Sequence, residues 1–304
     1  MKTLNLELGT NLAKLFFVEN INQEPVENYS EVNPQTVFSN ENPTPNNPPW
    51  SSLAAFFVWF SSIAFIILVP ILFVIPYLAQ QPNLLSDRIK AAEFLQNDPT
   101  ALLLSIIAVI PAHILTLVLA WAVVTKLNKF SFFETLGWKW GGFNVWNCLL
   151  ILAVIFIVAA VTSYYVPEQD NDLLRILRSS RAAVFVVAFL ATFTAPLVEE
   201  VIYRGVLYSA FQKNFGVIAG VVLTTLFFAL VHVPQYYPSY STIFLIVLLS
   251  LVLTLIRVRT KNLLPCVILH MIFNGIQSIL LILQPYFENA NPHEKAAAFI
   301  HLIK

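Results

Sequence analysis

Long hydrophobic runs alternate with short polar interruptions along most of the chain. A bilayer core about 30 Å thick needs about 20 mostly apolar residues per helix. Seven runs reach or approach this length, at 51–79, 101–125, 144–166, 182–212, 216–233, 241–256 and 263–284. The pattern predicts an all-α, polytopic integral membrane protein with about seven or eight transmembrane helices.

The polar segments suggest four divisions. Between Asn20 and Pro49, 30 residues include eight Asn and six Pro, which is too polar and too rich in proline to build a core. We therefore expect residues 1–49 to form a solvated, disordered or surface tail. N-terminal transmembrane helices follow at 50–180, a second transmembrane group at 181–284, and a C-terminal tail at 285–304.

Composition supports the membrane assignment. The chain has 304 residues, of which 58% are hydrophobic and only 11% are charged, whereas soluble domains carry about 25% charged residues. Its 17 basic and 17 acidic side chains cancel, so no basic face for nucleic acid is indicated. Membrane lipids are the expected surroundings. Cys148 and Cys266 lie inside apolar runs and are expected to be core residues.

The basic residues between the hydrophobic runs give a weak orientation signal. Loops between successive runs lie on alternate sides of the membrane. One side then carries Lys126, Lys129, Lys139, Lys213, Arg257, Arg259 and Lys261, and the other carries Arg88, Lys90, Arg175, Arg178 and Arg181. By the positive-inside rule, this count places the N-terminus in the cytoplasm and the C-terminus outside. The segment "DLLRILRSSR" could instead be a short interfacial helix, which would remove three residues from the smaller group.

Three ionisable residues interrupt the fourth hydrophobic run, in "APLVEEVIYRGVLYSAF". Each such group costs about 2.5 to 3.5 kcal/mol on insertion scales, so intramembrane charges are functional candidates. Glu200 and Arg204 are four residues apart on one helical face and are expected to pair. Glu199 lies about 100° around the helix and is left as the available carboxylate.

Two later runs carry polar residues at helical spacing. In "FFALVHVPQYY", Phe228 and His232 share a face, and in "PCVILHMIFNG", His270 and Asn274 do so. A single intramembrane histidine is usually packed and hydrogen-bonded, which is the interpretation for His113. Two histidines, one unpaired glutamate and one asparagine match the inventory of a hydrolase that activates water.

The ordered motifs E-E-x-x-x-R, F-x-x-x-H and H-x-x-x-N resemble the CAAX prenyl endopeptidase type II family, also called CPBP or ABI intramembrane proteases. The resemblance covers about residues 180 to 284, which would be the catalytic transmembrane core. It implies a catalytic role for Glu199, a water- or metal-positioning role for His232 and His270, and an oxyanion role for Asn274. Glu200 and Arg204 would give structural support, and Tyr203 stands where Phe is common.

The implied reaction is hydrolysis of a peptide bond by an intramembrane metalloendopeptidase. A divalent metal, expected to be zinc, would be held by Glu199, His232 and His270, although the same residues could hold water without a metal. Resemblance implies prenylated CAAX substrates in eukaryotic relatives and peptide processing or bacteriocin-related roles in bacterial ones. The expected partner is therefore a peptide or lipidated peptide.

Two other functions use the same residues differently. A proton-coupled transporter or channel would employ the Glu and His side chains as a relay, but no internal repeat is visible. A non-catalytic membrane scaffold or immunity protein would use them to hold helices together.

One expectation conflicts with a simple map of the hydrophobic runs. Glu199 lies 18 residues, or about 27 Å, from Arg181, whereas His232 lies near the end of its run. A kink at Pro196 or a re-entrant loop at "VPQYYPSYS" would bring the two residues together.

Overall fold

A computed structural model describes residues 42–81, 84 and 87–288, with side chains to residue 283. The chain divides after Pro43, and the compact unit begins at Thr44. Most of the predicted N-terminal tail, and the predicted C-terminal tail from residue 289, lie outside the described residues. In the described part, the regular elements are all helices, and the one pairing of extended backbone is an isolated bridge between Thr44 and Asn47. The predicted all-α class is confirmed.

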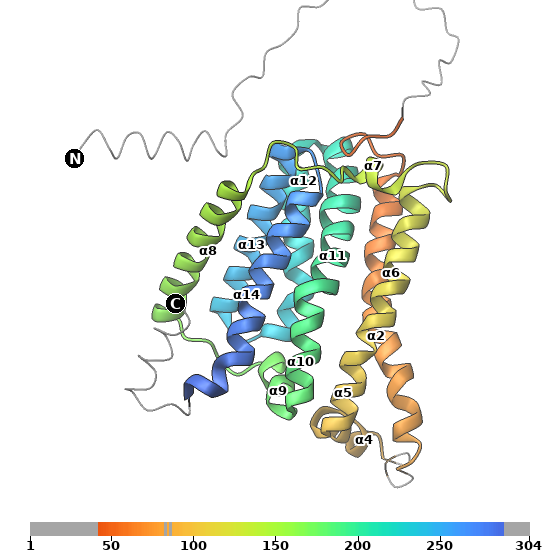
Figure 1. Cartoon of the computed structure of the whole chain (residues 1–304). Helices are drawn as coiled ribbons and strands as arrows, with labels where there is room; N and C mark the ends of the chain where they lie inside the picture. Colours follow the sequence, from red (N-terminus) through yellow and green to blue (C-terminus); the bar gives the residue numbers. More distant parts are fainter. Residues whose placement is uncertain (1–41, 82–83, 85–86, 289–304) are drawn as a thin grey trace, which may run out of the picture. The chain divides into compact units, whose positions relative to one another are not determined.

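The helices follow the predicted hydrophobic runs closely (Figure 1). In chain order, they are α2 (Ser52–Leu78), α4 (Arg88–Asn97), α5 (Pro99–Ile107), α6 (Val109–Val124), α7 (Phe132–Leu136), α8 (Val145–Tyr165), α9 (Asp172–Ser179), α10 (Arg181–Phe189), η1 (Leu190–Thr194), α11 (Ala195–Glu200), η2 (Val201–Leu207), α12 (Tyr208–Tyr236), α13 (Tyr240–Thr260) and α14 (Leu264–Glu288). The two η elements are π-helical.

Six helical stretches of the described chain are long and apolar enough to cross a membrane. One of them, Arg181–Tyr236, has 56 residues and would be about 84 Å long if straight, far more than one bilayer. It folds back at Gly216, whose φ of 84° is not helical. A Cβ on Gly220 would lie 3.0 Å from the backbone nitrogen of Gln212, so the two arms are in close contact. The stretch is therefore long enough for two crossings, one on each side of the reversal.

Polar residues between the runs cap the helices. The side chains of Ser51, Asp98, Asn144 and Ser180 each accept a hydrogen bond from a backbone N–H in the first turn of α2, α5, α8 and α10, respectively. Such N-caps satisfy donors that have no partner within the helix. The polar breaks in the sequence thus fix where several membrane helices begin.

Packing inside the bundle relies on small side chains. Ala55, Ala112 and Ala120 are fully buried, and α2 and α6, which carry them, lie side by side. Small residues let helix backbones approach closely where lipid removes the hydrophobic drive for association. Large apolar side chains such as Ile218, which is 82% exposed, instead face outward, as expected for a lipid-facing surface.

The continuous stretch from α10 to η2 carries both glutamates, and π-helix lies on each side of α11. Pro196 is the second residue of α11, in the first turn, where a missing N–H is tolerated. The segment around His232 remains in α12 to Tyr236 and is not a re-entrant loop. The predicted conflict in depth disappears when residues are counted from the reversal at Gly216, because Glu199 lies 17 residues before it and His232 lies 16 residues after it.

Candidate active site

Glu199, His232 and His270 converge from α11, α12 and α14. One carboxylate oxygen of Glu199 lies 3.9 Å from Nε2 of His232, and the other lies 3.8 Å from Nε2 of His270. The Glu199 side chain is 23% exposed and that of His232 is 18% exposed, whereas His270 is almost fully buried. Three residues from three sequence motifs therefore form one partly accessible cluster.

Both imidazole rings are held by hydrogen bonds through Nδ1. In His232, Nδ1 lies 2.7 Å from the carbonyl oxygen of Phe228, and in His270 it lies 2.8 Å from Oε1 of Glu200. Carbonyl and carboxylate oxygens accept hydrogen bonds, so Nδ1 carries the proton in each ring. When the rings are neutral, both Nε2 atoms present lone pairs toward Glu199.

The facing atoms of the cluster are thus all hydrogen-bond acceptors. Carboxylate oxygens and unprotonated Nε2 atoms do not hydrogen-bond to each other, and separations of 3.8 and 3.9 Å exceed a direct hydrogen bond. A species that donates protons or carries positive charge fits between them. A water molecule, an extra proton on an imidazole, or a cation would meet this requirement.

The predicted pair of Glu200 and Arg204 is present and fully buried. Nη1 of Arg204 donates to Oε1 of Glu200 at 2.8 Å, and Nη2 donates to the carbonyl and hydroxyl oxygens of Ser250 at 2.9 and 2.8 Å. Nε of Arg204 donates to the hydroxyl of Thr254, and the guanidinium lies 4.7 Å from the Phe228 ring centroid. This network anchors α13 against η2.

The contact between Glu200 and His270 was not predicted. The motif spacing assigned Glu200 to Arg204 alone, because helical periodicity relates only residues on one helix. The structure shows that Glu200 Oε1 accepts hydrogen bonds from both Arg204 and His270. A partner 70 residues away leaves no signal in local spacing. Glu200 therefore links the buried arginine to the cluster.

Other candidate residues lie near the cluster but have different partners. Nδ2 of Asn274 donates to the carbonyl oxygen of Ala191 in η1 at 2.9 Å, which leaves its second hydrogen for another acceptor. The Tyr203 hydroxyl accepts from Nε1 of Trp59. His113 is buried, with Nδ1 3.0 Å from the hydroxyl of Thr194, consistent with the packed role expected for it.

The donor atoms suit zinc, but their spacing does not. Two histidines and one glutamate form a common catalytic zinc set, and tetrahedral bonds of about 2.0 to 2.1 Å place neighbouring ligand atoms about 3.3 to 3.4 Å apart. The separations of 3.8 and 3.9 Å are wider. Across the residues that the structure describes, no group of three or more His, Cys, Asp or Glu side chains meets the geometry of a metal site.

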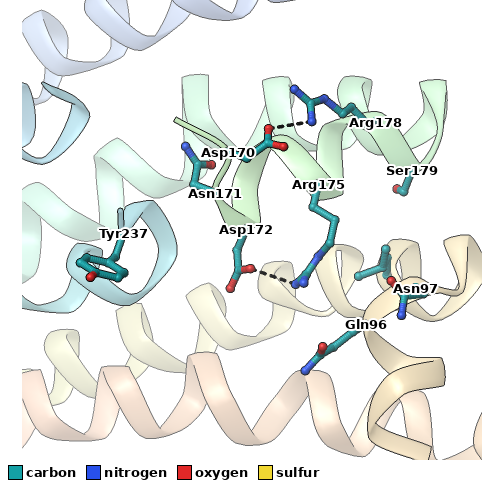
Figure 2. A pocket seen from close by; sticks show the side chains of 10 residues that line it. Gln96, Asn97, Asp170, Asn171, Asp172, Arg175, Arg178, Ser179 and Tyr237 are labelled. Atoms are coloured by element: carbon teal, nitrogen blue, oxygen red, sulfur yellow. Dashed lines mark hydrogen bonds and ion pairs between the residues drawn. The ribbon is translucent and has the colours of Figure 1, made fainter. Parts of the chain in front are cut away.

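A polar pocket of about 460 Å³ lies near the end of α12 that follows His232 (Figure 2). Tyr237 forms part of its wall, and the ring of the preceding Tyr236 stacks on His232 with centroids 6.3 Å apart. The other lining residues are Gln96, Asn97, Leu102, Asp170, Asn171, Asp172, Arg175, Arg178 and Ser179. Two ion pairs join residues that line the pocket, Asp172 with Arg175 and Asp170 with Arg178. The pocket places a polar surface close to the His232 end of the site.

Comparison with known proteins agrees with the motif assignment. Residues 181–276 match a family model described as type II CAAX prenyl endopeptidase, Rce1-like. No curated protein and no solved structure matches the chain. The matched range contains all three motifs, so the resemblance predicted from them is confirmed: residues 181–276 match the Rce1-like type II CAAX prenyl endopeptidase family.

Proposed function

We propose that this chain is an intramembrane endopeptidase that hydrolyses a peptide bond within the helical bundle. The observation that carries the proposal is the set of acceptor atoms on Glu199, His232 and His270, which face one another across 3.8 to 3.9 Å. The family match supports a peptidase, and the apolar crossings of the described chain supply the membrane setting. A water molecule between these atoms would donate one hydrogen to Glu199 and the other to an imidazole.

In the proposed reaction, Glu199 acts as general base. It removes a proton from the water as the oxygen attacks the carbonyl carbon of the peptide. The carbonyl π electrons move to oxygen and form a tetrahedral oxyanion. When the oxyanion collapses, the C–N bond breaks and the proton on Glu199 passes to the leaving amine. The products are a carboxylic acid and an amine, which exchange a proton to give a carboxylate and an ammonium group, and Glu199 is regenerated as a carboxylate.

The buried charges next to Glu199 would orient this site. The carboxylate of Glu200 keeps the proton of His270 on Nδ1, which directs Nε2 toward the water, and Arg204 balances the charge of Glu200. A base or ligand held by a third group is a recurrent device in hydrolytic sites. Asn274 would stabilise the oxyanion with the Nδ2 hydrogen that Ala191 does not use.

Zinc remains a prediction from the resemblance. If bound, it would use Glu199, His232 and His270 as ligands and would act as a Lewis acid toward water. Because the ligand atoms are spaced more widely than tetrahedral zinc requires, the steps proposed for Glu199 involve no metal.

The substrate is proposed to be a peptide or lipidated peptide. Proteomic comparison of membranes that contain wild-type protein or Glu199→Gln is the direct test, because it detects the cleavage of any protein in the membrane, whatever its sequence. We expect at least one peptide terminus to be present only with the wild-type protein. If the two membranes yield the same termini at equal protein levels, the endopeptidase proposal is wrong.

A further inference from the structure

Each of the two π-helical segments has a backbone carbonyl bonded to a side chain from another part of the molecule. The carbonyl of Ala191 in η1 accepts from Asn274, and that of Val206 in η2 accepts from Nε1 of Trp50 at 3.1 Å. π-helical turns use i→i+5 bonds, so passage between π and α geometry disturbs the i→i−4 ladder and frees backbone groups. Asn274 and Trp50 each provide a side-chain donor to one of these segments.

Trp50 ends a short docked segment, residues 44–50, which we call the strap. Trp50 is only 7% exposed, and its indole N–H reaches η2 across 156 positions of sequence. From the start of α12, Gln212 donates to the carbonyl of Asn46 at 2.8 Å and Lys213 donates to that of Pro48 at 3.0 Å. The strap is therefore tied to both η2 and α12.

A buried arginine also binds the strap. Arg257 is fully buried near the end of α13 and donates to the carbonyl of Pro45 at 2.7 Å, to Oδ1 of Asn46 at 3.1 Å and to the hydroxyl of Ser209. All three are neutral oxygens, and two of them belong to the strap. Because a buried cation needs its hydrogen bonds, loss of the strap would leave Arg257 poorly satisfied.

A second tryptophan reaches the same π segment from α2. Nε1 of Trp59 donates to the hydroxyl of Tyr203, a buried bond of 3.2 Å. Tyr203 and Val206 both belong to η2, which directly follows Glu199 and Glu200. Two indole N–H groups from outside the family-matched region thus hold the segment next to the proposed catalytic glutamate.

We infer that the strap and Trp50 set the rotation of the helix that carries Glu199, so that Trp50 is a positioning residue for the proposed peptidase. One residue of helix corresponds to about 100° of rotation. If η2 changed from π to α geometry, the preceding helix would turn by about one residue, and Glu200 would turn toward the space of Glu199. The hydrogen bond to Val206 opposes this change. The inference rests on the proposed function.

Two changes at Trp50 test the inference. Trp50→Phe removes the N–H together with part of the ring, whereas replacement by 3-benzothienylalanine keeps the ring size and removes only the N–H. Trp146→Phe is the matched control, because Trp146 is 75% exposed. Amide hydrogen exchange over residues 201–210 would be measured for each full-length protein in lipid nanodiscs. Cleavage would be measured with the peptide that wild-type membranes cleave and Glu199→Gln membranes do not.

We expect exchange in this segment to be about tenfold faster in both Trp50 variants and unchanged in the control. We also expect kcat to fall about tenfold or more with KM within about twofold, because misplaced groups weaken the transition state more than binding. If Trp50→Phe does not fold, the same measurements on the benzothienylalanine protein test the inference.

The two measurements separate the inference from the proposed function. Unchanged exchange in the benzothienylalanine protein overturns the inference whether or not the protein cleaves peptides. Faster exchange with unaltered kcat also overturns it, because η2 would then be free to move without affecting Glu199. If the wild-type protein cleaves no peptide, faster exchange in the Trp50 variants still supports the tether, and the absence of cleavage counts against the peptidase alone.

Discussion

Adjacent glutamates on one helix have opposite surroundings in this protein. Glu200 is fully buried between Arg204 and His270, whereas the Glu199 side chain is 23% exposed and faces two Nε2 lone pairs. Oε1 of Glu200 already accepts hydrogen bonds from Arg204 and His270, whereas the oxygens of Glu199 lie beyond hydrogen-bond distance of both imidazoles and remain partly exposed. Glu199 is therefore the better general base of the two.

Replacement of Glu199 by Gln should abolish cleavage with little effect on stability. The amide keeps the side-chain size but cannot accept a proton in the reaction, and the described contacts of Glu199 with His232 and His270 are longer than hydrogen bonds. The measurements are a peptide-cleavage assay and thermal unfolding in detergent. Residual cleavage by this variant would show that another group is the base.

Replacement of Arg204 by Ala should instead lower stability. It removes four described hydrogen bonds and leaves Glu200 as an uncompensated buried charge, which typically costs about 3 to 5 kcal/mol. Glu200→Gln combined with Arg204→Met removes both charges and should restore much of the melting temperature. Cleavage should stay low in the double variant, because His270 loses its carboxylate partner. A stable Arg204→Ala protein would contradict this account.

Removal of metal tests the spacing of the site. Since the facing atoms of Glu199 and the two histidines lie wider than tetrahedral zinc requires, we expect cleavage to survive dialysis against a strong chelator. Elemental analysis of the dialysed, active protein should find less than one metal ion per chain. Loss of activity that added zinc restores would favour the metalloendopeptidase mechanism instead.

At the scale of elements, the reversal at Gly216 sets the depth of the site. It makes Glu199 and His232 nearly equidistant from one turn, and Gly220 lets the two arms touch. Gly220→Val would place a Cβ 3.0 Å from the backbone of Gln212 and should cost about 1 to 3 kcal/mol. In thermal unfolding, Gly275→Ala is a suitable control, because its Cβ would meet Thr192 at an ordinary 3.4 Å. Equal melting temperatures for the two variants would argue against the close hairpin.

Across the whole molecule, the structure shows which basic residues lie between the membrane helices and which are buried. Arg257 is buried by the strap, and Arg175 and Arg178 belong to the separate short helix α9, as one interpretation of "DLLRILRSSR" expected. Without these three, the bases near the ends of the crossings are Lys126, Lys129, Lys139, Lys213, Arg259 and Lys261 on one side and Arg88, Lys90 and Arg181 on the other. The cytoplasmic N-terminus remains a prediction from the count of basic residues.

Cysteine labelling would test this orientation. We expect Lys129→Cys to react with an impermeant thiol reagent only from the cytoplasmic side and Lys90→Cys only from the opposite side. Both positions are exposed, and Cys148 and Cys266 are buried, so background labelling should be low. The reverse pattern would invert the assigned topology.

Much of the site could be predicted because its parts are local. The spacing of Glu200 and Arg204 specified their ion pair, and three motifs in apolar runs indicated Glu199, His232 and His270 before any fold was known. The link between Glu200 and His270 was missed because it joins different helices. The π segments were also missed, since residue spacing carries no clear signal for i→i+5 bonding.

The sequence by itself determined the membrane-spanning helices, their caps and the candidate residues of the site, because hydrophobic length, helical periodicity and capping act over a few turns. Tertiary structure decided that Nε2 of His270 presents a lone pair to Glu199, since Glu200, on another helix, holds the Nδ1 of that ring. The Nδ1 of His232 is held locally, by Phe228 four residues earlier. Tertiary structure also decided that the strap docks on the helices. Residues 44–49 look like solvated tail by composition, yet their carbonyl groups are the partners of a buried arginine more than 200 residues away. Long-range hydrogen bonds of this kind depend on how the helices pack, which no local pattern encodes.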